Sequence, residues 1–214
     1  NEGIKSVGGK GIDMSWEDTQ KTLMEATFDR KFQYSCHLKL LQSKALNNIF
    51  KYERGLGTFI DNHHVKIQKS NGDSKTIYAE NIIIATGSKP RTLPSIDVDE
   101  KIIMTSDGVD HMKSFPKSMV IVGAGVIGCE YATIFSNFGK TKVYIIDRSD
   151  RILPFEDSDI SDMISKNLKL KGVTIHNKAQ LERLEVKDGE VEYELSYKDG
   201  KKEIIKVEKA LLSV

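Results

Sequence analysis

The chain has 214 residues, enough for one large or two ordinary domains. Hydrophobic residues make up 39% and charged residues 29%, with a formal net charge of +1, a balance typical of a soluble globular protein. The charge does not indicate a nucleic-acid-binding protein, for which a strong basic excess is expected. No apolar run approaches the roughly 18 residues of a membrane-spanning helix. The polar, glycine-rich start differs from a secretory signal peptide.

The first quarter of the chain predicts a loop and then a helix. Residues 1–12 carry four glycines and predict a loop. Ser15 and Asp18 have the spacing of an N-terminal capping box. Apolar residues recur at roughly helical intervals from there to about Lys51, with a break in the pattern near residues 34–37. We expect an amphipathic helix packed on a sheet.

A β-meander and a buried strand are predicted next. Alternating segments between residues 55 and 79, with the hairpin signal Asn71-Gly72, predict three short strands. The apolar run Ile82–Ala85 predicts a strand buried on both faces, as in a parallel sheet. It ends in a Thr-Gly-Ser turn, where backbone can approach a ligand. Prolines then begin a mixed linker over residues 91–117, so we expect two structural units.

A glycine-rich turn between a strand and a helix is the strongest motif. The apolar run Met119–Val122 leads into Gly123-x-Gly125-x-x-Gly128, and a helical pattern follows through Phe138. In a dinucleotide-binding unit the first glycine makes a tight turn. The second lets the pyrophosphate approach the backbone, and the third lets the helix pack on the strand. The helix N-terminus offers free N–H groups to the phosphates.

An acid at the end of the next strand completes the pattern. The segment Lys142–Ile146 is followed by Asp147, 24 positions after Gly123. A carboxylate there accepts hydrogen bonds from the adenosine ribose hydroxyls and repels a 2′-phosphate. Strand, motif, helix, strand and acid together predict a dinucleotide site that prefers NAD to NADP. A glycine-rich turn without a ligand is the weaker alternative.

The remaining segments predict the fold class. We expect a helix over residues 157–171, a third parallel strand at 173–176, an antiparallel meander over 181–207 and a last strand at 210–214 that returns to the sheet. The predicted fold is α/β, a Rossmann-like doubly wound parallel sheet with a β-meander. The C-terminal part of another domain precedes it.

The two cysteines and five histidines do not support a metal site or a dithiol. Cys36 and Cys129 are far apart and form no CxxC pair, and the histidines show no HxxxH or HExxH spacing. Cys129 falls in the first turn of the helix after the glycines, where the helix dipole could lower its pKa. We prefer the alternative of a small side chain packed between helix and sheet.

Three segments, in this order and spacing, resemble one protein family. They are Ile82–Pro90, Val120–Glu130 and Asp150–Pro154. They are similar to the pyridine nucleotide–disulfide oxidoreductases, and most of all to the dihydrolipoamide dehydrogenases, over essentially the whole chain. The resemblance implies that residues 1–112 are part of an FAD-binding domain and residues 113–214 an NAD-binding domain. Both would belong to a longer subunit, as the absence of an initial Met also indicates.

The resemblance also implies contacts with both cofactors. The Thr-Gly-Ser turn and a glycine before the meander would lie against FAD. The glycine-rich turn, the acid and a leucine on the adenine side would bind NAD, with Glu130 near the nicotinamide. The residues implied for FAD are Gly57, Thr86, Gly87 and Ser88, and those implied for NAD are Gly123, Ala124, Gly125, Val126, Ile127, Gly128, Cys129, Glu130, Asp147 and Leu181.

The chain departs from the family pattern in what it lacks. The redox pair CxxxxC, the first FAD fingerprint and the interface domain with its His-Glu pair are not among these residues. We therefore expect no catalytic residue here. By resemblance, the intact enzyme passes electrons from dihydrolipoamide, free or on a lipoyl protein, through a cysteine pair and FAD to NAD. We expect a homodimer in the cytoplasm, or in an organelle matrix in a eukaryote.

Two alternatives stay open. A soluble pyridine nucleotide transhydrogenase shares the resemblance around Gly128–Ala132 and Asp157–Asp162, and it needs no dithiol. Arg148 and Arg151 could receive a 2′-phosphate if the strand end shifts, whereas glutathione and mercuric reductases fit less well because they prefer NADP. A non-catalytic NAD-binding protein is the alternative from another class. It leaves the Thr-Gly-Ser segment without a purpose.

Overall fold

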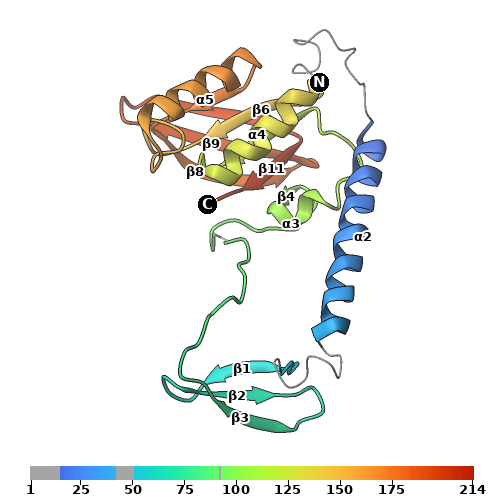
Figure 1. The fold of residues 1–214 in the computed structure, drawn as a ribbon. Helices are drawn as coiled ribbons and strands as arrows, with labels where there is room; N and C mark the ends of the chain where they lie inside the picture. Colours follow the sequence, from blue (N-terminus) through green and yellow to red (C-terminus); the bar gives the residue numbers. More distant parts are fainter. Residues whose placement is uncertain (1–14, 42–50, 92) are drawn as a thin grey trace. The chain divides into compact units, whose positions relative to one another are not determined.

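The computed structural model describes residues 15–41, 51–91 and 93–214 (Figure 1). The chain divides into two compact units. One contains the chain up to Gln20 together with Lys89–Val214, and the other contains Lys21–Ser88. No helix among the described residues combines the length and the apolar character that a membrane crossing requires. The predicted loop over residues 1–12 lies outside the described residues.

The first described helix, α2 (Trp16–Leu41), begins as the capping pattern predicts. The Ser15 hydroxyl accepts a hydrogen bond from the Asp18 N–H at 3.0 Å and donates one to the Asp18 carboxylate at 2.7 Å. Trp16 is buried, and its indole N–H donates to the carbonyl of Met112. The predicted break near residues 34–37 is wrong, because the helix is continuous there. Its predicted extension toward Lys51 falls on residues 42–50, which are not described.

The smaller unit contains the predicted three-stranded meander. Its antiparallel strands, in the order β1-β2-β3, are β1 (Leu56–Phe59), β2 (His64–Gln68) and β3 (Ser74–Tyr78). Gly72, in the predicted hairpin turn, has a φ of +90°, which favours glycine. This part of the prediction is confirmed.

The buried strand predicted for Ile82–Ala85 is wrong. Residues 82–91 have no regular secondary structure, and Ile83 is 92% exposed. A strand exists only through hydrogen bonds to a neighbouring strand, and no strand of the described residues pairs with this segment. An apolar run is therefore not sufficient to form a strand without a partner.

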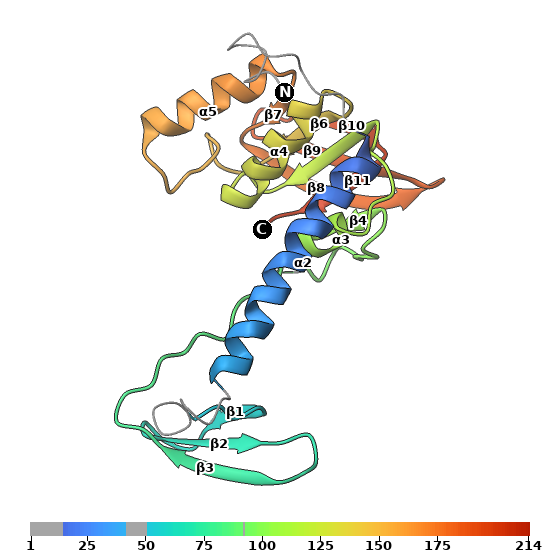
Figure 2. The same ribbon diagram turned by 45° about the vertical axis from the view of Figure 1, so that its right-hand side comes forward.

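The larger unit is built around a five-stranded parallel sheet (Figures 1 and 2). Its strand order, β4-β11-β5-β6-β7, confirms the predicted Rossmann-like α/β fold. The edge strand β4 lies inside the segment predicted as a linker, residues 91–117, so this segment contributes to the sheet. The strands are β4 (Ile103–Met104), β5 (Ser118–Val122), β6 (Lys142–Ile146), β7 (Thr174–His176) and β11 (Lys209–Leu212).

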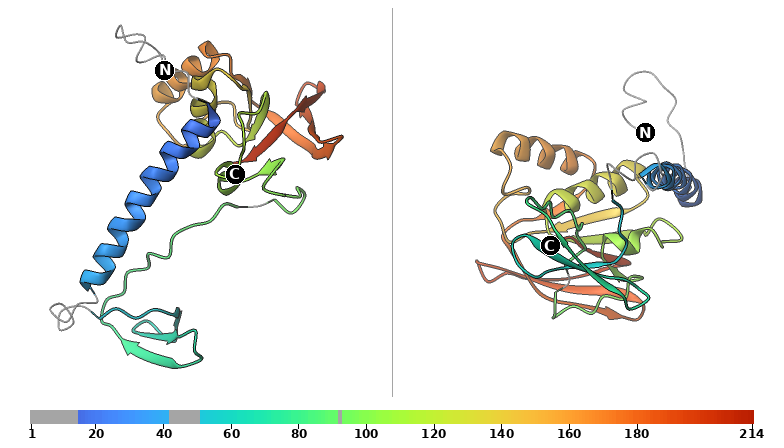
Figure 3. Two further views of the ribbon diagram at one scale, coloured as in Figure 1. Left: turned by 90° about the vertical axis from the view of Figure 1, so that its right-hand side faces the viewer. Right: turned by 60° about the horizontal axis from the view of Figure 1, so that its bottom comes forward.

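Helices cover one face of this sheet and an antiparallel meander covers the other, as Figure 3 also shows from two further directions. A hydrophobic core lies on each face of the sheet, and alternate residues of β5 pack into one core or the other. Met119 and Ile121 pack on the helix side, and Val120 and Val122 pack on the meander side. The covering elements are α4 (Val126–Phe138), α5 (Ser158–Leu170), β8 (Ala179–Lys187), β9 (Glu190–Tyr197) and β10 (Lys202–Val207), and the short helix α3 (Ser106–Val109) follows β4.

A β-bulge interrupts the alternation of β8. Leu181 pairs with Leu195 and Arg183 pairs with Glu194, so Glu182 is the extra residue. Leu195 is buried in the core between the meander and the sheet, and Leu181 therefore faces that side. Arg183 faces the opposite side, beside Glu194.

Candidate functional site

The glycine-rich turn joins β5 to α4 at the carboxyl end of the parallel strands. Gly123 has a φ of +104°, and its N–H donates to the carbonyl of Ile146 at 2.9 Å. A Cβ on Gly128 would collide with the Gly123 carbonyl oxygen and lie 2.8 Å from the Ser213 hydroxyl. The helix therefore packs on the turn at a distance that only glycine allows.

Gly125 has a different environment. It is the N-cap residue of α4, with no side-chain cap. A Cβ on it would meet no atom within 4 Å. The backbone at the start of α4 is thus open to a ligand, and the N–H groups of a first helical turn attract phosphate. The turn fits a dinucleotide diphosphate.

Asp147 follows β6, and its carboxylate contacts the glycine-rich turn. Oδ2 accepts a hydrogen bond from the N–H of Ala124 at 2.8 Å, and Oδ1 accepts one from the N–H of Ser149 at 2.8 Å. Each carboxylate oxygen can accept more than one hydrogen bond. Asp147 is only half-buried, so it can also accept hydrogen bonds from a ribose.

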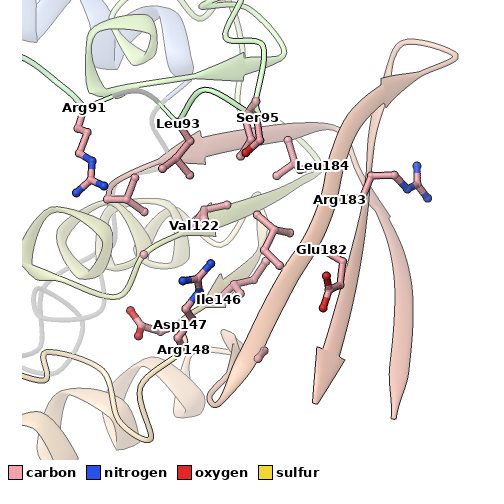
Figure 4. Close-up of a pocket in the computed structure, with 15 residues that line it drawn as sticks. Arg91, Leu93, Ser95, Val122, Ile146, Asp147, Arg148, Glu182, Arg183 and Leu184 are labelled. Atoms are coloured by element: carbon pink, nitrogen blue, oxygen red, sulfur yellow. The ribbon is translucent and has the colours of Figure 1, made fainter. Parts of the chain in front are cut away.

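Gly123, Asp147 and Leu181 line one cavity of about 370 Å³ (Figure 4). Ile146 and Leu184 add apolar wall beside Leu181. Ligands of open α/β sheets bind at the carboxyl ends of the strands, and a mostly apolar pocket with a few polar groups is typical of cofactor sites. This cavity is therefore the candidate nucleotide site.

The two arginines considered for a 2′-phosphate lie in different environments. Arg148 lines the cavity beside Asp147, and it has no hydrogen bond or ion pair with the described part of the chain. Arg151 instead donates to the carbonyls of Pro154 and Glu156, at 3.2 and 3.1 Å. Of these two arginines, Arg148 is therefore the one available to a bound nucleotide.

Several residues implied for NAD lie away from this cavity. Val126, Cys129 and Glu130 line a second cavity of about 810 Å³, together with residues of α5. Ile127 is 48% exposed on α4, and Ala124 is buried, with its N–H bound to Asp147. Of the residues implied for NAD, the structure thus brings some together around the first cavity and places others along α4.

Cys129 is buried, as the packing interpretation predicts. It is 5% exposed, and its thiol lies 3.5 Å from the carbonyl of Ala124. Burial, with a smaller effect of Asp147, raises the pKa of Cys129 to about 11. The alternative of a pKa lowered by the helix dipole is wrong, because desolvation disfavours the thiolate.

The residues implied for FAD lie in the smaller unit and are exposed. Gly57 belongs to β1, and Thr86, Gly87 and Ser88 belong to the irregular segment after the meander. Their exposed arrangement does not by itself form a cradle for a flavin, and their role stays a prediction. Within the described residues no group of three His, Cys, Asp or Glu side chains is arranged to hold a metal ion.

One wall of the candidate nucleotide cavity was not predicted from the sequence. Arg91, Leu93 and Ile96 line it from the segment predicted as a linker. No motif marks these residues, although an apolar pair near two prolines indicates an anchored segment rather than a free one. The contact with β8 at Leu184 was also missed, because the bulge cannot be read from the alternation.

Comparisons with known proteins show the family of the chain. The sequence profile described as pyridine nucleotide-disulphide oxidoreductase matches residues 14–214. A soluble pyridine nucleotide transhydrogenase from Sodalis glossinidius is 38% identical over 148 residues, which cover 69% of this chain and 31% of that protein. One from Colwellia psychrerythraea is 39% identical over 155 residues, covering 72% and 33%. The chain spans about a third of the length of these relatives.

Solved structures share the fold. LpdA from Mycobacterium tuberculosis superimposes with a TM-score of 0.77 at 21% identity, covering 100% of this chain and 45% of that one. The Cu(II) complex of the C43S mutant of the HOCl-induced flavoprotein disulfide reductase RclA from Escherichia coli gives a TM-score of 0.65 at 28% identity, covering 87% of this chain and 41% of that one. The family's cofactors are FAD and NAD(P). This chain belongs to the pyridine nucleotide–disulfide oxidoreductase family.

Proposed function

We propose that this chain is the NAD(H)-binding portion of a flavin-dependent pyridine nucleotide oxidoreductase. One observation carries the proposal. The carboxylate of Asp147 lies on the same cavity as Gly123 and is hydrogen-bonded to the backbone of the glycine-rich turn. An acid at this place is the feature that distinguishes a dinucleotide site from an ordinary glycine turn.

The residues that line the cavity and the neighbouring start of α4 would divide the binding between them. Leu181 and Ile146 would cover the adenine, and Asp147 would accept hydrogen bonds from the ribose. The open backbone at Gly125 would receive the diphosphate. The nicotinamide of the bound nucleotide supplies the hydride chemistry. This chain would contribute orientation of the nucleotide, and we do not expect the buried Cys129 thiol, whose pKa is raised, to react.

The charge beside the ribose favours NAD over NADP. The Asp147 carboxylate repels a 2′-phosphate, while the neighbouring Arg148 attracts one. Because Asp147 is fixed by two backbone hydrogen bonds and Arg148 is exposed, we expect the acid to dominate. Equilibrium titration of the whole protein with NADH and NADPH tests this. Comparable affinities would count against Asp147 as the selecting residue.

The electron partner of the whole protein has two candidates. Transhydrogenation between NAD(H) and NADP(H) is supported by relatives of that name at 38% and 39% identity. Arg148 on the cavity is consistent with it, since a transhydrogenase has to admit both nucleotides. Oxidation of dihydrolipoamide by NAD is supported by the resemblance of Ile82–Pro90 and Asp150–Pro154 to dihydrolipoamide dehydrogenases.

Two assays on the purified whole protein separate these candidates. One follows reduction of a thio-NAD analogue by NADPH, and the other follows reduction of NAD by dihydrolipoamide. Activity in only the first supports the transhydrogenase, and activity in only the second supports the dehydrogenase. Binding of NADH by a colourless protein without flavin absorbance, with neither activity, would instead support a non-catalytic NAD-binding protein.

A further inference from the structure

Arg91 reaches the nucleotide cavity from the segment between the smaller unit and β4. Its neighbours Leu93 and Ile96 pack into the core between the sheet and the meander, so the backbone that carries Arg91 is anchored. Arg91 itself is exposed and lines the cavity with Gly123 and Asp147. Figure 4 shows Arg91 and Arg148 on different walls of this cavity.

Some of the charged side chains that line the cavity have partners within the protein and others do not. Arg183 forms ion pairs with glutamates of the meander. Glu182 accepts a hydrogen bond from a serine of β9, and Asp147 accepts two from the backbone. Arg91 and Arg148, in contrast, have no hydrogen bond or ion pair with any described residue. The cavity therefore presents two free guanidinium groups to a ligand.

The glycine-rich turn leaves a dinucleotide's diphosphate without a neutralising side chain. The motif from Gly123 to Glu130 contains no Lys, Arg or His. One of its N–H groups, that of Ala124, already donates to Asp147. A diphosphate carries two negative charges, and a guanidinium can bind its oxygens with two parallel hydrogen bonds. Arg148 stands next to the ribose-binding acid in sequence, which leaves Arg91 for the diphosphate.

We propose that Arg91 is a nucleotide-binding residue that donates to the diphosphate of the bound dinucleotide. This inference rests on the proposed function of the cavity and adds a residue that acts alike on NADH and NADPH. It thus separates two tasks. Asp147 and Arg148 act on the ribose that distinguishes the two nucleotides, and Arg91 acts on the group that they share.

The test uses the whole protein with Arg91→Gln and, as a matched control, Lys101→Gln. Lys101 is an exposed cation of the segment before β4 that does not line the cavity. Dissociation constants are measured for NADH and NADPH, and for adenosine as a competitor that lacks phosphate. We expect Arg91→Gln to weaken the binding of both dinucleotides about tenfold or more. The dissociation constant of adenosine for Arg91→Gln, and those of both dinucleotides for Lys101→Gln, should stay within about twofold of wild type. The dissociation constant of NADH should depend less steeply on salt concentration in Arg91→Gln than in wild type.

The outcomes distinguish this inference from the function on which it rests. If the wild-type protein binds neither dinucleotide, the proposed function fails. Two other results would overturn only the role of Arg91. In one, Arg91→Gln binds the dinucleotides as tightly as wild type does. In the other, its affinity for adenosine falls as much as its affinity for the dinucleotides. Should Arg91→Gln lower the melting temperature, Arg91→Lys decides. An NADH affinity between those of wild type and Arg91→Gln supports the contact, and an affinity equal to Arg91→Gln overturns it.

Discussion

The carboxylate of Asp147 and the backbone N–H of Ala124 are joined by a hydrogen bond of 2.8 Å. This bond connects the end of β6 to the glycine-rich turn after β5. The same carboxylate holds the N–H of Ser149 in the next loop. Asp147 therefore positions the turn as well as lining the candidate nucleotide cavity. A substitution there changes both the shape of the site and its charge.

Replacing Asp147 with Asn separates part of these effects. The amide oxygen can still accept one backbone hydrogen bond, while the negative charge is lost. We expect the preference for NADH over NADPH to narrow by about tenfold, equivalent to about 1.4 kcal/mol. The ratio of the two dissociation constants, measured by fluorescence titration, checks this. An equal loss for both nucleotides would show that positioning of the turn accounts for the whole effect.

Gly125→Ala and Gly128→Ala form a matched pair within one motif. At position 125 a methyl group meets no protein atom within 4 Å, so the fold should be kept. The methyl group would occupy the space in which a diphosphate approaches the backbone. We expect a melting temperature close to wild type and an NADH affinity reduced at least tenfold, equivalent to about 1.4 kcal/mol.

At position 128 the added methyl group would collide with the Gly123 carbonyl. We expect Gly128→Ala to lower the free energy of unfolding by about 1–3 kcal/mol, as for other overpacked sites. Denaturant unfolding measures this, and NADH titration of the same samples completes the comparison. The assignment of separate roles to the two glycines would be wrong if Gly125→Ala proved the more destabilising.

His176 should make stability depend on pH. Burial lowers the pKa of His176, with a smaller contribution from Lys201, although Glu203 acts in the opposite direction. Its Nδ1 lies 2.8 Å from the Tyr197 hydroxyl. The unfolded chain, with a histidine pKa of about 6.5, binds a proton before the folded protein does. Stability is therefore full above that pH and falls as the pH is lowered through it.

Thermal unfolding between about pH 7.5 and pH 5, the range around the histidine pKa, checks this prediction. His176→Gln should flatten the dependence of the melting temperature on pH in that range. His111→Gln is the control, because His111 is an exposed histidine of the same unit. An unchanged slope in His176→Gln would mean that another group causes the loss of stability.

Cys129 should be unreactive in the native protein. Its pKa of about 11 leaves little thiolate at neutral pH, and its side chain is buried. A maleimide should label Cys129 only after unfolding, as peptide mass spectrometry can show. Cys36, an exposed thiol on α2, is the internal comparison. Rapid native labelling of Cys129 would contradict the packing role.

The predictions that succeeded depend on local patterns. The glycine spacing at Gly123 and the acid at Asp147 mark a unit whose strand, turn and helix are adjacent in the chain, and the turn signal at Gly72 acts over a few residues. The strand predicted at Ile82–Ala85 failed because strand formation depends on a partner elsewhere in the chain. Sequence patterning reports the apolar run but not the partner.

The candidate site was predicted only in part for a similar reason. Leu184 and Arg91 reach the cavity from segments 93 residues apart in the chain, and neither belongs to a motif. The two-residue strand β4 is too short to show any periodicity. The burial of Cys129 was predictable from its place in the motif. The effect on its pKa required knowing that the protein interior, rather than the helix dipole, dominates.

The bulge at Glu182 has a consequence for how β8 tolerates change. On one side of it, the core-facing residue is Leu181, and on the other it is Leu184, so the two ends of the strand are out of phase. Deleting Glu182 would remove the extra residue and place Leu181 directly before Arg183, opposite Leu195 and Glu194, so both ends of the strand would keep the faces that they have now. Deletion of Glu182 should therefore be tolerated better than a one-residue deletion or insertion farther along β8, which would turn the end of the strand to the opposite face.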